Sequence, residues 1–206
     1  MRPVLGCPDP AMLFLALPLL VASGRPLFYW GSRAAVIVAD PPSAPGVEAQ
    51  VTEVHAALDK GDLVLRFTFD RVVTSAMYGE GGAPVSGRLR VVLYIDTDGD
   101  RTTGLSGASG DLLRGADHRL EVGVVAVGKD EEENLPAEAL VIASVASLSP
   151  EGRRHGTWKV DDSSPLLSIH GEWLELRVPL DKVPARSGSR LILAMGDKAY
   201  DGRLKP

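Results

Sequence analysis

A strand pattern runs directly into an acidic loop between residues 89 and 104: Leu89-Arg90-Val91-Val92-Leu93-Tyr94-Ile95-Asp96-Thr97-Asp98-Gly99-Asp100-Arg101-Thr102-Thr103-Gly104. Every second residue from Leu89 to Ile95 is apolar, and the residues between them are more polar. A period of two is typical of a half-buried β-strand. The pattern predicts a strand with one face in a hydrophobic core, ending where the aspartates begin.

Three aspartates at alternate positions follow this strand: Asp96, Asp98 and Asp100. Their carboxylates would repel one another unless a positive charge lies between them. Calcium takes several oxygen ligands, and acids at loop positions one, three and five with a backbone carbonyl near position seven provide them. The sequence therefore predicts a calcium site with these three carboxylates and the Thr102 carbonyl as ligands. The alternative is a solvated turn of Asp and Gly without an ion.

The same spacing opens the EF-hand loop, but the rest of that motif is missing. An EF-hand loop has Gly at its sixth position and a bidentate Glu at its twelfth, and it lies between helices. This chain has Arg101 and Gly107 at those positions, and a strand pattern precedes the loop. We therefore expect a cation loop between strands.

A fourth acid, Asp117, begins the next strand pattern: Gly115-Ala116-Asp117-His118-Arg119-Leu120-Glu121-Val122. Its carboxylate is expected to complete the cation shell. A site of this kind would mainly stabilise the fold, because the binding free energy of the ion adds to that of folding.

The order of these phrases resembles the DOMON-like modules related to the family 9 carbohydrate-binding modules. The phrases are Leu-Tyr-Ile-Asp-Thr-Asp-Gly-Asp, then Thr-Gly, then Gly-Ala-Asp with an alternating strand, and a late Trp-Leu-Glu-Leu-Arg-Val-Pro-Leu. The resemblance covers about residues 47–200, and His118 departs from it, because the family tends to have an aromatic residue there. It implies an antiparallel β-sandwich, frequent in exported bacterial proteins, with calcium, sugar or haem as ligands.

Further runs share the strand period or are rich in β-branched residues: Leu63–Phe69, Leu120–Ala126, Ala139–Leu148, Trp158–Val160, Leu166–Ile169, Trp173–Val178 and Leu191–Met195. The run over residues 139–148 is long enough for a helix, but its Val and Ile residues favour a strand. Turn residues separate the runs at short intervals, and strong amphipathic helices are missing. The expected fold is all-β, an antiparallel β-sandwich of jelly-roll or immunoglobulin-like type.

The first 24 residues have the pattern of a signal peptide. The apolar run from Ala11 to Ala22 is too short to span a bilayer comfortably, and small residues up to Gly24 suit cleavage. The alternative is an uncleaved membrane anchor, with the aromatic residues 28–30 at the interface. Either predicts an exported protein, periplasmic, cell-surface or extracellular. The only cysteine, Cys7, lies in this segment, so cleavage would leave a chain without disulfides.

The length of 206 residues suits one domain with extensions. Residues 25–46 end in Asp40-Pro41-Pro42-Ser43-Ala44-Pro45-Gly46, which predicts a Pro-rich lead-in. Residues 47–206 are expected to form the DOMON-like β-sandwich domain.

The function predicted from the sequence is a binding module for carbohydrate or a cell-envelope component. Sugars stack on aromatic rings, and Trp158 and Trp173 are the candidate ligand-binding residues, Trp158 being flanked by charged residues and so the better placed for exposure. By alternation, Trp173 shares a face with Glu175 and Arg177, away from the core. Aromatic residues make up only 5% of the chain, so both tryptophans could instead pack at sheet margins.

Other classes of function have less support. A formal net charge of −5 argues against a nucleic-acid partner, and a membrane contact is expected only through the N-terminal segment. A nucleophile elbow, a zinc motif and a phosphate loop are missing, so we do not expect an enzyme. The alternative to a binding module is a structural or accessory domain with a protein partner and calcium as its only small ligand.

Overall fold

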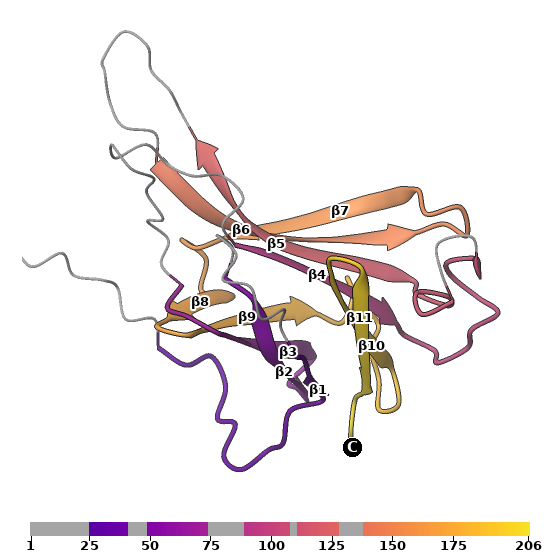
Figure 1. The fold of residues 1–206 in the computed structure, drawn as a ribbon, viewed down its shortest axis with the longest axis horizontal. Coiled ribbons are helices and arrows are strands. Elements are labelled where there is room, and N and C mark those ends of the chain that lie inside the picture. The colour runs from indigo at the N-terminus through magenta and orange to yellow at the C-terminus, as the bar shows by residue number, and fades with distance from the viewer. Residues whose placement is uncertain (1–24, 41–48, 74–88, 108–110, 128–137) are drawn as a thin grey trace, which may run out of the picture.

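The computed structural model describes residues 25–40, 49–73, 89–107, 111–127 and 138–206. These residues form two antiparallel sheets that share one hydrophobic core, which confirms the expected all-β sandwich (Figure 1). Residues 1–24, predicted to be a signal peptide or a membrane anchor, lie outside the described residues, as does most of the proline-rich run. Within the described ranges, no helix has the length and apolar character needed to cross a membrane.

The first sheet has five strands in the order β1-β2-β3-β9-β8. Their bounds are β1 Ile37–Val38, β2 Val51–Asp59, β3 Asp62–Phe69, β9 Trp173–Pro179 and β8 Leu167–His170. Strands β2 and β3 form a hairpin, and β9 pairs with β3 across more than 100 residues of chain. Residues 25–40, expected as a lead-in, thus contribute one strand of the sandwich.

The second sheet has six strands in the order β11-β10-β4-β5-β6-β7. Their bounds are β11 Lys198–Arg203, β10 Arg190–Met195, β4 Arg90–Asp96, β5 His118–Val127, β6 Glu138–Leu148 and β7 Arg154–Asp161. Figure 1 shows β4 to β7 as long strands side by side. The run over residues 139–148 is therefore a strand, as its β-branched residues predicted.

The core lies between the two sheets and is built by the alternation that the sequence predicted. Leu63, Leu65 and Phe67 of β3 are fully buried, and so are Leu93 and Ile95 of β4. These strands thus give one apolar face to the core, and burial of that face is the main stabilising term.

Strands β2 and β11 were not predicted, because their sequences lack the period of two. In β2 the core residues Val51 and Val54 are three apart, since a bulge between Val51 and Glu53 shifts the register. The third buried residue, Ala57, belongs to the other face of the strand, in the cluster with Trp30. Strand β11 is an edge strand with largely polar residues. Neither pattern is distinguishable from a helix or a loop without the neighbouring strands.

The outer face of the first sheet is covered by the chain segment before β1. Trp30 is only 6% exposed and packs with Phe28 against Ala57 and Val64. The Trp30 indole Nε1 donates to Glu175 Oε1 at 2.6 Å. A second, smaller apolar cluster therefore lies on this face, outside the main core.

Candidate functional site

The candidate site lies where two adjacent strands of the second sheet, β4 and β5, meet the acidic loop. Ile95 and His118 are the last paired residues of these strands, and the Asp117 amide donates to the Ile95 carbonyl at 2.8 Å. Asp96 and Asp117 come next on the two strands and point to the outer face of the sheet, because Ile95 and His118 face inward. The pairing of the strands therefore brings two acids together that are 21 positions apart in the sequence.

Three carboxylates gather at this point: Asp96, Asp98 and Asp117 each offer one oxygen, and these oxygens lie within 4.8 Å of one another. Oxygen ligands lie about 2.3–2.6 Å from a calcium ion, so two ligands of one ion are at most about 5 Å apart. The observed separations fit that limit. Three of the five residues predicted as ligands therefore lie at distances suited to binding one cation.

Asp96 occupies the most buried position of the three, with a side chain that is 0% exposed. Its Oδ1 accepts a hydrogen bond from the Gly99 amide at 2.6 Å, but its buried Oδ2 has no hydrogen-bond partner among the described residues. Burial raises the pKa of the Asp96 carboxyl, the Gly99 amide opposes this, and the nearby charges of Asp117 and Asp98 raise it further. A buried acceptor without a donor costs free energy unless a cation or water supplies the missing contact.

The other two carboxylates are positioned by loop hydrogen bonds. Asp117 Oδ2 accepts from the amide of Thr97 at 2.8 Å and from its hydroxyl at 2.7 Å. Asp98 is exposed, and its Oδ1 accepts from the Asp100 amide at 2.8 Å. These hydrogen bonds hold two of the three carboxylates in place.

The Asp100 carboxylate, also predicted as a ligand, does not join the three carboxylates of the described cluster. The backbone carbonyl of Thr102 stays a prediction. Asp100 Oδ1 accepts from the amide of Thr102 at 2.9 Å and from its hydroxyl at 2.7 Å, and both residues are exposed. These two hydrogen bonds lower the pKa of the Asp100 carboxyl. The pair forms a local turn beside the cluster.

Two residues that the sequence reading did not select support the loop: Gly115 and Arg190. Gly115 has a φ of 90°, and a Cβ there would lie 2.8 Å from the Arg101 Cα and 3.2 Å from Asp96 Oδ2. Arg190 is 2% exposed and donates to the carbonyl of Leu112 at 3.0 Å. The chain thus passes the acidic loop so closely that only glycine fits at residue 115. This constraint comes from a tertiary contact, so the residues around Gly115 in the sequence do not reveal it.

His118 follows Asp117 directly but belongs to the core side of the sheet. It is 8% exposed, and burial lowers the pKa of its imidazole, although the neighbouring Asp117 opposes this. The imidazole is therefore neutral at pH 7 and points away from the carboxylates. His118 is therefore a buried residue of the sheet and not a ligand of the cluster.

The two tryptophans predicted to bind ligand lie on different sheets. Trp158 of β7 is half-buried, pairs with core residue Val145 and packs against the core, so it is less exposed than its charged neighbours suggested. Trp173 of β9 lies on the outer face as predicted, stacked on His170 at 5.0 Å between ring centroids and with the Arg66 guanidinium 4.8 Å from its own centroid. The structure does not bring them together into one platform.

Comparison of the chain with protein-family models, with curated proteins and with solved structures gave no match. Functional inference therefore depends on the geometry of the site.

Proposed function

We propose that this protein is an exported, calcium-stabilised β-sandwich binding module. Two observations at Asp96 carry the calcium site: its buried Oδ2 has no hydrogen-bond partner among the described residues, and one of its carboxylate oxygens lies within 4.8 Å of oxygens of Asp98 and Asp117. Calcium is the hard cation whose ligand distances and preference for carboxylates suit this arrangement. Asp96, Asp98 and Asp117 are the proposed ligands.

The ion would act as a clamp between β4, β5 and the loop that joins them. Three carboxylates within 4.8 Å repel one another when all are ionised, and a divalent cation turns this repulsion into attraction. Because a preformed site does not exist in the unfolded chain, the binding free energy stabilises the fold. The cation is thus structural, and we propose no catalytic role.

The proposed ligand of the module is carbohydrate or a cell-envelope component. The resemblance to DOMON-like and carbohydrate-binding modules supports carbohydrate or a cell-envelope component, and the apolar run Ala11–Ala22 supports export. The partial burial of Trp158 and the contacts on Trp173 argue against a tryptophan platform. The alternative remains an accessory domain that presents its surface to a protein partner.

Thermal unfolding of the full chain with calcium and in chelator tests the metal site. We expect calcium to raise the melting temperature by several degrees, since a ligand at 100 times its Kd adds about 2.7 kcal/mol to stability. Asp98→Asn should remove most of this increase, because it replaces a charged ligand of the ion with a neutral one. Asp98 is exposed, so its replacement should leave the fold intact.

Asp100→Asn is the matched control for this experiment. It removes the same charge from the same loop, but the Asp100 carboxylate binds Thr102 and lies outside the three-acid cluster. It should retain most of the calcium-dependent shift. Equal melting temperatures of the unmodified protein in calcium and in chelator would overturn the metal site.

A further inference from the structure

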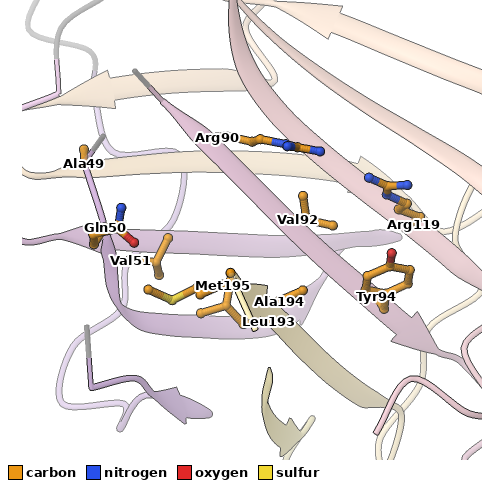
Figure 2. A pocket seen from close by; sticks show the side chains of 11 residues that line it. Ala49, Gln50, Val51, Arg90, Val92, Tyr94, Arg119, Leu193, Ala194 and Met195 are labelled. Carbon is orange, nitrogen blue, oxygen red and sulfur yellow. The ribbon is translucent and has the colours of Figure 1, made fainter. Parts of the chain in front are cut away.

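We propose that the outer face of the second sheet binds a small ligand bearing a carboxylate, in a pocket between β4, β5 and β10. The pocket has a volume of about 360 Å³, within the size range of small-molecule sites. Its described lining includes Arg90, Tyr94 and Arg119 together with the apolar residues Val92 and Met195 (Figure 2). The proposal deepens the proposed function by naming a ligand class, but it uses none of the metal-binding side chains.

Strand pairing places the two arginines and the tyrosine on one face. Arg90 and Tyr94 are four residues apart on β4, and Arg119 of β5 pairs with Tyr94. Residues at alternate positions point to the same side, and paired residues of adjacent strands do so as well. Figure 2 shows both guanidinium groups on the same side of β4. The donors therefore converge on the same space.

Arg119 is held in a fixed position before any ligand arrives. Its guanidinium lies 5.6 Å from the centre of the Tyr94 ring, and its Nη2 donates to Glu121 Oε1. Its side chain is 19% exposed, and its buried Nε has no partner among the described residues. Part of its donor capacity is thus unused by the described protein groups, and the ordering cost on binding is reduced.

The charge balance around Glu121 favours an anion. Arg90, Arg119 and Arg154 all lie within ion-pair distance of this one carboxylate, at up to 3.9 Å for Arg90. Three positive charges against one negative charge leave two in excess among these four groups. Arginine forms paired hydrogen bonds with carboxylates, which makes a carboxylate the fitting anion.

The rest of the lining indicates that the ligand also has a less polar part. Val92 and Ala194 are paired residues of β4 and β10, and Met195 follows on β10. These side chains extend the pocket away from the arginines toward Val51. A compact organic acid would place its carboxylate at the arginines and its carbon skeleton along this apolar side.

The test is a titration of the full chain, followed by NMR or calorimetry, with two acids and their neutral counterparts. Benzoate is compared with benzamide, and D-glucuronate with D-glucose, so that apolar and polyhydroxylated acids are distinguished. We expect at least one acid to bind at millimolar concentration or below, and its neutral counterpart to bind about tenfold more weakly, as loss of a charge-assisted hydrogen bond predicts. Binding of neither acid, or equal binding of the neutral compounds, would overturn the proposal.

Arg90→Gln and Arg154→Gln form a matched pair of variants. Both arginines interact with Glu121 and have side chains that are 63% and 47% exposed, so neither change endangers the fold, but only Arg90 lines the pocket. Arg90→Gln should weaken acid binding about tenfold and Arg154→Gln less than twofold. Equal weakening by both would mean that acids are attracted by the overall positive charge of this face and not bound in the pocket, which would contradict the proposal. Repeating the titration in calcium-depleted buffer separates this result from the metal site, which can fail independently.

Discussion

A buried carboxylate such as Asp96 is costly to keep ionised, and this cost makes the site responsive to pH. Burial and two neighbouring acids raise the pKa of the Asp96 carboxyl above its value of 3.8 in the unfolded chain. Without calcium, the folded protein therefore binds this proton more strongly than the unfolded chain. The stability contributed by the protonated form is present at low pH and is lost as pH rises through the raised pKa.

The calcium-dependent increase in melting temperature should consequently grow with pH. Calcium competes with protons for Asp96, so the increase should be small at about pH 4.5 and larger at about pH 7. Thermal unfolding in calcium-depleted and calcium-containing buffers across this range measures the effect. An increase of the same size at every pH would show that no carboxyl of raised pKa belongs to the site.

Sequence reasoning at the residue scale found the cluster but could not separate its members from their neighbours. Asp98 and Asp100 have the same spacing from their neighbours and follow the same strand. Only the course of the loop distinguishes them, with Gly99 at a φ of 76° between them, and Asp100 bonded to Thr102. Alternation along a strand predicts the face to which a side chain points, but it predicts nothing about side chains in a loop such as Asp98 and Asp100.

Residue 115 approaches the acidic loop so closely that a side chain at this position would be crowded. A Cβ at Gly115 would meet the Arg101 Cα at 2.8 Å, while Gly61, in the β2–β3 turn, has a similar φ of 93° and open space around it. The two glycines therefore share backbone strain and differ in crowding.

Gly115→Ala should destabilise the protein by about 2–4 kcal/mol, and Gly61→Ala by about 1 kcal/mol, because overpacking adds to left-handed strain only in the first. Gly115→Ala should also weaken calcium binding, since the added methyl group lies 3.2 Å from Asp96 Oδ2. Denaturant unfolding and a calcium titration provide both numbers. Similar losses for the two variants would mean that crowding at residue 115 is relieved by movement of the loop.

For the molecule as a whole, the sandwich followed from strand periodicity, but the cover over its first sheet did not. The alternation in β9 correctly placed Trp173 and Glu175 on the outer face. That face is covered by Trp30, which is 145 residues away from Glu175 in the sequence. The residues next to Glu175 in the sequence do not indicate that this acid is buried. Contacts of this range cannot be read from a single sequence.

Glu175 is the group that holds the N-terminal segment onto this sheet. Its Oε1 accepts from Trp30 Nε1 and from Arg66 Nε at 2.8 Å, and its Oε2 accepts from the Leu27 amide. A glutamine would offer one acceptor oxygen and turn an amide donor toward another donor. Glu175→Gln should therefore cost about 3 kcal/mol, as expected when one partner of a buried ion pair is lost.

Chemical denaturation measures this loss, and hydrogen exchange at the Leu27 amide reports release of the segment. Glu172→Gln is the control, because Glu172 is exposed and changes of this kind usually alter stability by less than about 0.5 kcal/mol. If Glu175→Gln were equally mild, the segment would be held by its other contacts, the apolar packing of Trp30 and the hydrogen bonds to the Leu27 and Arg25 carbonyls.

The position of the N-terminal segment also determines on which side of the sandwich the described chain begins. The Arg25 carbonyl accepts a hydrogen bond from the Ser168 hydroxyl at 3.0 Å, so the described chain begins on the outer face of the five-stranded sheet. The arginine pocket lies on the outer face of the other sheet, on the opposite side of the core. If residues upstream of Arg25 attach the protein to a larger surface, the attachment point and the pocket are on opposite sides of the sandwich, and the pocket is turned toward the medium.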